Sequence, residues 1–153
     1  MTTRVGIGYD SHRFAVGRRL VLGGVEVPHE AGLEGHSDAD VLTHAVIDAV
    51  LGAAGLGDLG TLFPPSDDRW RDAHSLDLLT VAIGNLHGRV VNVDATMICE
   101  APRIGPHRAE MERNLAAVLS ATVSVKATTN EGMGWIGRGE GIACSAVALV
   151  ELD

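Results

Sequence analysis

Apolar side chains recur every four residues from Val41 to Ala53, and a second series from Leu42 to Val50 runs beside the first. Two neighbouring series at this spacing predict a helix with a wide apolar face, which has to pack against the rest of the chain. Ser37 precedes the helix and is followed by two carboxylates, so we expect Ser37 to be its N-cap residue. Four glycines between Gly52 and Gly60 then end the helix in a flexible stretch.

Short apolar runs on both sides of this helix predict strands. The other expected elements are a strand over 4–9, a hairpin over 20–27 with a Gly23-Gly24 turn, a loop over 61–74, a helix from Ser75 to about Leu86, a strand over 89–98, a helix opened by Pro106, and strands over 123–128 and 141–152. This order predicts an α+β fold: a mainly antiparallel or mixed four-stranded sheet, ferredoxin-like, with helices on one face, plus the small hairpin. The other face of the sheet then needs cover, and a partner subunit is the simplest cover for a chain of this size.

The composition narrows the class of protein. A length of 153 residues fits one domain over 1–153, and 46% hydrophobic with 21% charged residues excludes a disordered chain. No apolar run approaches the roughly 20 residues of a membrane span, and no secretory signal pattern opens the sequence. A net charge of −8, with only two Trp, one Tyr and two Phe, argues against nucleic acid and membranes as partners. Cys99 and Cys144 form no CxxC pattern, so we expect buried thiols and a cytoplasmic protein.

Asp10 and His12 follow the first predicted strand, and residues two apart in an extended chain point the same way. Alone this pattern is weak, since a turn aspartate beside a surface histidine gives the same sequence. His44 lies one turn into the long helix, four residues after Asp40 and four before Asp48. It is either a surface histidine paired with these acids or a third metal ligand that one of them orients. Two histidines and one aspartate would leave an open coordination position, as catalytic zinc sites do.

A second constellation lies near the end of the chain. Thr128, Thr129 and Glu131 precede the stretch 132–141, in which every second or third residue is glycine. Glycine lets a backbone approach a phosphate closely, and hydroxyls with a carboxylate can hold phosphate oxygens and Mg²⁺. The alternative is a glycine-rich connection between two strands, and the chemistry of the residues alone does not separate the two.

Taken together, several motifs resemble one enzyme family over almost the whole chain, from about Arg4 to Leu152. The matching motifs are Asp10-x-His12, Gly35-His36-Ser37-Asp38-x-Asp40 with His44, Gly57-Asp58-Leu59-Gly60-x-x-Phe63-Pro64, Ala101-Pro102-Arg103, Lys126-Ala-Thr-Thr, and Gly137-Arg138-Gly139-Glu140-Gly141. In order and spacing they resemble the 2-C-methyl-D-erythritol 2,4-cyclodiphosphate synthases of the non-mevalonate isoprenoid pathway. The resemblance implies a phosphorus–oxygen lyase that cyclises 4-diphosphocytidyl-2-C-methyl-D-erythritol 2-phosphate and releases CMP.

The resemblance also implies roles for residues. Asp10, His12 and His44 would bind one divalent metal per chain, zinc or else manganese, and would lie beside the substrate. His36 would stabilise the transition state and, with Ser37, contact the diphosphate. Thr129 would steady the departing phosphate, and Glu131 would hold a Mg²⁺ that bridges the diphosphate, within a cluster made of Thr128, Thr129, Asn130 and Glu131. The methylerythritol would be held by Asp58, Leu59, Gly60, Phe63, Pro64, Pro65, Ser66 and Asp67. Cytosine would be read by Cys99, Glu100, Ala101, Pro102, Arg103, Ile104 and Gly105.

For the assembly, the resemblance implies a homotrimer with its sheets facing the axis and its active sites between subunits. Trp135 and Ile136 would line an axial cavity, with Arg138 from each chain forming a cationic ring that suits an isoprenyl diphosphate. The alternative there is ordinary interface packing and a plain Arg138–Glu140 ion pair. Two rival functions stay open: a metal-dependent phosphohydrolase on the same Asp-His-His site, and a trimeric binding protein whose metal is structural. The open coordination position argues against the second.

Overall fold

The computed structural model describes all 153 residues. Its main sheet has five strands in the order β4-β1-β7-β5-β6, and only β5 and β6 are parallel. The strands are β1 (Thr2–Val16), β2 (Leu20–Leu22), β3 (Val25–Val27), β4 (Ala31–Leu33), β5 (Gly88–Ile98), β6 (Thr122–Thr128) and β7 (Gly141–Leu152), and β2 pairs with β3 as the expected hairpin. The helices are α1 (Val41–Ala54), α2 (Leu59–Leu62), α3 (Ser75–Gly84), α4 (Arg108–Leu119) and α5 (Gly134–Gly137), with 3₁₀ turns η1 (Asp68–Trp70) and η2 (Gly105–His107).

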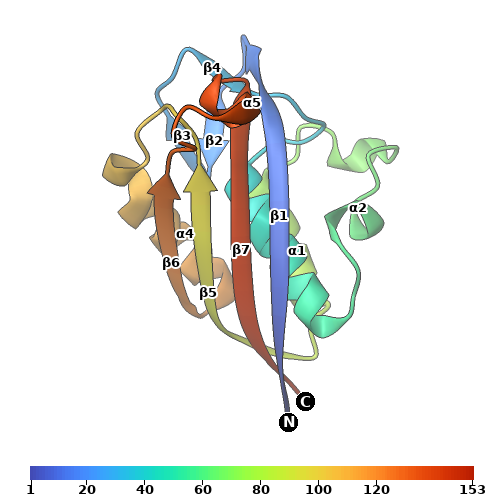
Figure 1. Cartoon of the computed structure of the whole chain (residues 1–153). Coiled ribbons are helices and arrows are strands. Elements are labelled where there is room, and N and C mark those ends of the chain that lie inside the picture. The colour runs from blue at the N-terminus through green and yellow to red at the C-terminus, as the bar shows by residue number, and fades with distance from the viewer.

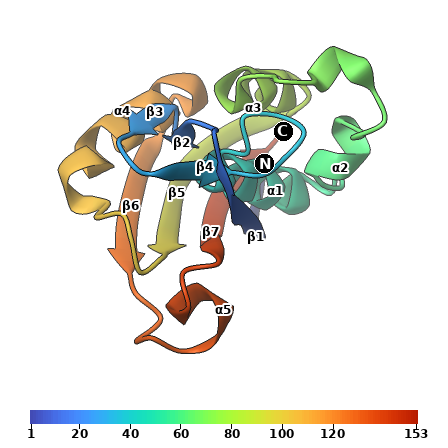
Figure 2. The same ribbon diagram turned by 90° about the horizontal axis from the view of Figure 1, so that it is seen from above.

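The long helices cover one face of the sheet, as expected, and the core of 35 buried residues lies between the two layers (Figures 1 and 2). The opposite face carries exposed apolar side chains, among them Val5 and Ile7, which are 68% and 73% exposed, and Tyr9 and Val147. Nothing within the chain covers this face. None of the helices combines the length and the apolarity that crossing a membrane would require.

The topology corrects three expectations. The sheet has five strands instead of four, because Ala31–Leu33 forms an edge strand that pairs with the far end of β1. β1 is also longer than the predicted 4–9, so Asp10 and His12 lie within a strand and not beyond its end. The main elements follow the order β-α-β-α-β-β, whereas a ferredoxin-like fold runs β-α-β-β-α-β. The layering is therefore as predicted, and the ferredoxin-like connectivity is wrong.

α1 packs against β1 at unusually short range. A Cβ atom on Gly8 would lie 1.9 Å from the carbonyl oxygen of Ala45, and one on Gly6 would lie 2.0 Å from that of Ala49. These distances are below any real contact, so only glycine on the strand, facing alanine on the helix, permits this approach. The close packing brings the first turn of α1 beside the middle of β1.

The helix starts differ from the predicted ones. Asp40, not Ser37, caps α1, because its carboxylate accepts a hydrogen bond from Thr43 N and is also held by the hairpin turn through Gly23 N and Gly24 N. Ser75 is the first residue of α3 instead of its cap, and α3 ends at Gly84 instead of Leu86. The hydroxyls of Ser37 and Ser75 are directed to His44 instead.

Candidate metal centre and substrate pockets

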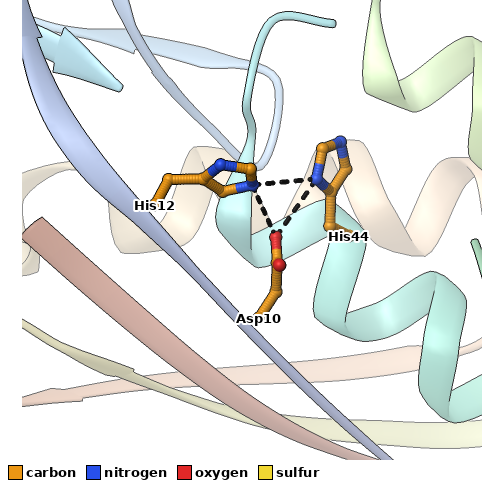
Figure 3. A group of neighbouring side chains, drawn as sticks. All are labelled: Asp10, His12 and His44. Atoms are coloured by element: carbon orange, nitrogen blue, oxygen red, sulfur yellow. Dashed lines mark hydrogen bonds and ion pairs between the residues drawn. The ribbon is translucent and has the colours of Figure 1, made fainter. Parts of the chain in front are cut away.

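Three predicted metal ligands converge in the structure. Asp10 Oδ2 lies 2.8 Å from His12 Nε2 and 3.1 Å from His44 Nδ1, and the two ring nitrogens are 3.3 Å apart (Figure 3). Asp10 and His12 come from β1, where alternate residues share the helix-facing side, and His44 comes from the first turn of α1. The glycine–alanine contact between these two elements therefore sets the spacing of the cluster.

Contacts outside the cluster decide which ring nitrogens face it. His12 Nδ1–H donates to the carbonyl oxygen of Glu34 at 2.8 Å, and His44 Nε2–H donates to Ser75 Oγ at 2.8 Å. Ser75 Oγ–H in turn donates to the carboxylate of Asp38. In this tautomer, neutral His12 and His44 offer the lone pairs of Nε2 and Nδ1 to a metal ion, whereas without one the same nitrogens can carry protons and donate to Asp10.

The donor set fits a divalent metal ion. Two imidazole lone pairs and one carboxylate point to a common centre, and such a set is complemented by a cation and leaves a coordination position open. Burial alone would raise the pKa of Asp10, but its hydrogen bonds and charge interactions with His12 and His44 lower it to about 2. Burial lowers the pKa of His12, yet the hydrogen bond and the charge of Asp10 raise it above its ordinary value. Both pKa shifts show that the cluster favours the presence of positive charge.

The expectation that Asp40 or Asp48 orients His44 is wrong. Asp40 is fully buried and accepts hydrogen bonds from Gly23, Gly24 and Thr43, and burial together with the charge of Asp38 raises its pKa. Asp48 accepts a hydrogen bond from Leu59 N at 2.7 Å and so anchors the start of α2. The orienting carboxylate is that of Asp38, which acts through Ser75, a residue from a different helix. Spacing along one helix could not reveal this contact.

The cluster lies in a pocket that also holds other predicted substrate residues. The lining residues besides the cluster are His36, Ser37, Leu59, Phe63, Pro65, Trp70 and Leu78. Trp70 and Leu78 were not predicted, because the methylerythritol residues that the resemblance implied stop at Asp67 and nothing in the sequence links Leu78 to the site. The loop that carries His36 is braced by Arg18, whose guanidinium donates to the carbonyl oxygens of Gly35 and Ser37 at 2.6 Å each.

Other predicted methylerythritol residues have structural contacts of their own. Asp58 caps α2 by accepting a hydrogen bond from Thr61 N at 2.8 Å. Asp67 caps η1 and forms an ion pair with Arg69 at 2.6 Å. Gly60, Pro64 and Ser66 belong to the same segment without lining the pocket itself. The predicted loop over 61–74 is therefore a partly helical segment, which contains the end of α2 and all of η1 and lies at one side of the metal cluster.

The predicted cytosine segment and the threonines form a second pocket. Its lining residues are Cys99, Glu100, Pro102, Arg103, Ile104, Gly105, Ala127, Thr128 and Thr129, while Ala101, Asn130 and Glu131 adjoin it in sequence. The parallel pairing of β5 with β6 brings the two segments together, because Ile98 lies opposite Thr128. Burial and the charge of Glu100 raise the pKa of the Cys99 thiol to about 11.

Glu100 binds the backbone of the neighbouring turn. Its carboxylate accepts hydrogen bonds from Asn130 N at 2.8 Å and from Gly132 N at 2.7 Å. Between these two residues, Glu131 adopts a left-handed backbone with φ of 55°. The Glu100 side chain is thus committed to shaping the turn that presents Thr129 and Glu131.

The two pockets are separate within one chain. β7 and β5 lie between β1, which carries Asp10, and β6, which ends at Thr128 (Figure 1). Three strand spacings correspond to about 14 Å. The structure therefore brings the metal ligands to His36 and Ser37, and the cytosine segment to Thr128 and Thr129, but it does not join the two groups.

The region predicted to line an axial cavity is only partly exposed. Trp135 is half-buried, and Ile136 is 7% exposed, so its side chain belongs to the interior of the chain. Arg138 donates from Nε to Glu140 Oε2 at 2.7 Å. The Arg138–Glu140 ion pair, which the sequence offered as the alternative to a cationic ring, is therefore present within the chain.

Comparisons with known proteins agree with the resemblance seen in the sequence. A model of the YgbB family matches residues 3–151. The 2-C-methyl-D-erythritol 2,4-cyclodiphosphate synthase of Symbiobacterium thermophilum is 57% identical over 152 residues, which cover 95% of this chain and 97% of the relative. The bifunctional IspDF of Campylobacter jejuni superposes with a TM-score of 0.91 at 39% identity, over 99% of this chain and 43% of that longer chain. IspF of Plasmodium falciparum in a CDP complex superposes with a TM-score of 0.84 at 34% identity, over 99% of this chain and 97% of the other.

Proposed function

This chain belongs to the YgbB family, that of the 2-C-methyl-D-erythritol 2,4-cyclodiphosphate synthases, and we propose how its own residues carry out the cyclisation. The enzyme converts 4-diphosphocytidyl-2-C-methyl-D-erythritol 2-phosphate to the 2,4-cyclodiphosphate and CMP, a step of non-mevalonate isoprenoid biosynthesis. The observation that carries the proposal is the convergence of Asp10, His12 and His44 in one pocket with His36 and Ser37.

The reaction sets modest demands on acid–base chemistry. An oxygen of the substrate's 2-phosphate forms a bond to the β-phosphorus, the bond from that phosphorus to the CMP oxygen breaks, and CMP leaves with the electron pair. Because the attacking phosphate is already an anion, no general base is needed. The protein has to position the two phosphates and neutralise their charge.

The metal centre would be formed by Asp10, His12 and His44, with zinc as the first choice and manganese as the second. A divalent ion held there would polarise the β-phosphate as a Lewis acid. His36 lines the same pocket, and its Nε2 is buried and meets no partner within the chain, so it is available to the substrate. His36 would stabilise the negative charge on the oxygens of the transferred phosphoryl group, and Ser37 Oγ would donate to the diphosphate.

The second pocket would hold the nucleotide. Backbone groups from Cys99 to Gly105 would read the cytosine, with Arg103 exposed beside them. Thr129 Oγ–H would donate to the departing phosphate, and the exposed carboxylate of Glu131 would hold a Mg²⁺ on the diphosphate. The CDP complex of the P. falciparum relative supports a nucleotide site in this fold.

The two pockets would meet across a subunit boundary. Exposed apolar side chains on the outer face of the sheet, such as Val5 and Ile7, support a homotrimer in which these faces pack around the axis. The metal cluster of one chain would then lie opposite the Thr128–Glu131 turn of the next. We expect light scattering to give three times the chain mass at micromolar concentration, and a fully active monomer would contradict the assembly.

Arg138 marks the proposed axial cavity. Three copies of this guanidinium would repel one another, and Glu140 already offsets each charge within its own chain. An isoprenyl diphosphate, with an anionic head and an apolar tail, would suit a ring of such pairs beside Trp135. We expect Arg138→Ala to assemble normally but to bind isoprenyl diphosphates more weakly. Unchanged affinity would contradict this cavity ligand.

Product analysis tests the reaction itself. Incubation with the diphosphocytidyl substrate should give CMP and the cyclic diphosphate in equal amounts, without inorganic phosphate. A metal-dependent phosphohydrolase on the same ligands would instead release inorganic phosphate, and a binding protein with a structural metal would leave the substrate intact. The relatives favour the cyclisation.

A further inference from the structure

Trp70 lines the metal pocket, but no role has been given to it so far. It is the last residue of η1, and its ring meets that of Phe63 edge-on, with 4.9 Å between centroids and 84° between planes. Its indole Nε1–H is buried and has no hydrogen-bond acceptor within the chain. Buried polar groups in proteins nearly always have a partner, so an unpaired donor in the wall of a substrate pocket calls for an acceptor on the ligand.

Neighbouring contacts hold the indole in place. The guanidinium of Arg69 lies 5.3 Å from the centre of the Trp70 ring, and Arg69 is itself bound by the carboxylate of Asp67. The backbone that follows η1 is also held in place, since Ala73 N donates to Trp70 O at 3.1 Å and Asp72 N donates to His36 O at 3.0 Å. The last bond links the turn directly to the loop of the catalytic histidine.

The surroundings define the kind of acceptor. Leu59, Phe63 and Leu78 make this side of the pocket apolar, while Trp70 offers a neutral donor and not a charge. Such a wall suits a short carbon chain that carries hydroxyl or phosphate-ester oxygens. An indole N–H donates only, so it also selects an acceptor oxygen and rejects a second donor.

We propose that Trp70 Nε1–H donates a hydrogen bond to an oxygen of the methylerythritol phosphate half of the substrate and so contributes to specificity for that half. This inference rests on the proposed function, because it takes that substrate as the occupant. Phe63 supports the ring that carries the donor, and the link from Asp72 to His36 keeps donor and histidine at a fixed spacing.

Two substitutions separate the N–H group from the ring. Trp70→Phe keeps an aromatic ring against Phe63 but removes the donor, whereas Trp70→Leu removes both. We expect Trp70→Phe to raise KM for the diphosphocytidyl substrate about tenfold, with kcat changed by less than about threefold and the melting temperature unchanged or higher. Trp70→Leu should raise KM at least as much and also lower the melting temperature.

Binding of partial ligands locates the contact. By calorimetry, Trp70→Phe should bind the cyclic diphosphate product about tenfold more weakly, while its affinity for CDP, which lacks the polyol, should equal that of the unaltered enzyme. Unchanged KM and product affinity in Trp70→Phe, with loss only in Trp70→Leu, would reduce Trp70 to an apolar wall and overturn the proposal. An equal loss of CDP and product affinity would overturn it as well. Neither outcome touches the proposed reaction, which fails only if the unaltered enzyme forms no cyclic product.

Discussion

The two pockets of this chain are built in different ways. In the metal pocket, the functional side chains lie on β1 and α1 and are held by further side chains and carbonyls, such as Ser75 on His44 and Glu34 on His12. In the second pocket, the proposed nucleotide site, Thr129 and Glu131 are exposed on a turn after β6, and the carboxylate of Glu100 accepts backbone hydrogen bonds from this turn.

The first group of side chains is thus held from several sides within the chain, whereas the second group is held mainly at its backbone. Metal ligands must be fixed to within fractions of an ångström, and packing within one chain supplies that rigidity. In the second pocket, the exposed Thr129 hydroxyl accepts a hydrogen bond only from Glu131 N of its own turn, at 3.2 Å. In the proposed trimer, the ligand and the neighbouring subunit would supply the remaining partners of these groups.

The largest expected effect comes from removing a metal ligand. His44→Ala should lose the bound metal and lower kcat/KM by about a thousandfold or more, because the Lewis acid is worth several kcal/mol to the transition state. The fold should persist, since the core does not depend on the metal. Elemental analysis with an activity assay checks this, and His87→Ala, on an exposed histidine remote from both pockets, is the control. Stoichiometric metal in His44→Ala would remove His44 from the ligand set.

Next come the residues assigned to the transition state, one from each pocket. His36→Ala and Thr129→Ala should each lower kcat by about 10²–10³ if they stabilise charge that develops during transfer. Metal content should stay at one ion per chain in both variants. Thr122→Ala, an exposed threonine at the other end of β6, serves as the control. An effect confined to KM would mean that these groups bind substrate and transition state equally.

The close contact between β1 and α1 predicts that the stability of the chain depends on glycine at position 8. Gly8→Ala places a Cβ against the Ala45 carbonyl and should cost about 3 kcal/mol or more of unfolding free energy, because backbone must move. Gly52→Ala in α1 is the matched control. The added Cβ would lie 3.9 Å from the carbonyl oxygen of Ile7, so this variant should be neutral or slightly more stable. Equal stability of the two variants in urea unfolding would refute the packing argument.

A smaller effect is expected at the carboxylate that shapes the second turn. Glu100→Ala should lower kcat/KM about 10- to 100-fold through disorder of the Thr129–Glu131 turn, with metal content unchanged. Glu100→Gln can still accept one backbone hydrogen bond and should recover part of the loss. Glu112→Ala also removes a carboxylate from a backbone amide, that of Val125, and should leave the kinetics unaltered. If Glu100→Ala keeps full activity, the conformation of the turn does not depend on the Glu100 carboxylate.

The smallest effect concerns the reactivity of the Cys99 thiol in the second pocket. With a pKa of about 11, Cys99 carries roughly one thiolate in a thousand molecules at pH 8, and the thiolate is the reactive form. Iodoacetamide should therefore label it slowly at pH 8, and the rate should rise as pH increases towards 11. Mass spectrometry of the native and the urea-unfolded protein measures both rates. Rapid labelling of the native protein at pH 8 would contradict the buried, protonated thiol.

The sequence predicted much of this arrangement, and its failures share a cause. The hairpin with its Gly23-Gly24 turn, the helix over 41–54 and the layering are local or periodic signals, and they were predicted correctly. The convergence of Asp10 with His12 was also predicted, because residues two apart in an extended chain share one strand face. The edge strand Ala31–Leu33 and the Asp38–Ser75–His44 chain were missed, since each depends on partners far apart in sequence. Asp40 was wrongly expected to orient His44. Helical spacing alone cannot show that the Asp40 carboxylate is hydrogen-bonded to Gly23 N and Gly24 N of the hairpin.

A subunit complementation assay tests most directly whether the two pockets form one active site across a boundary. His44→Ala lacks the metal half but keeps the Thr129 half, and Thr129→Ala has the opposite defect. In trimers assembled at random from equal amounts of both, one site in each mixed trimer combines two intact halves, so about a quarter of the unaltered activity should return. Activity no greater than the mean of the two variants alone would show that both halves act within one chain and would contradict the account.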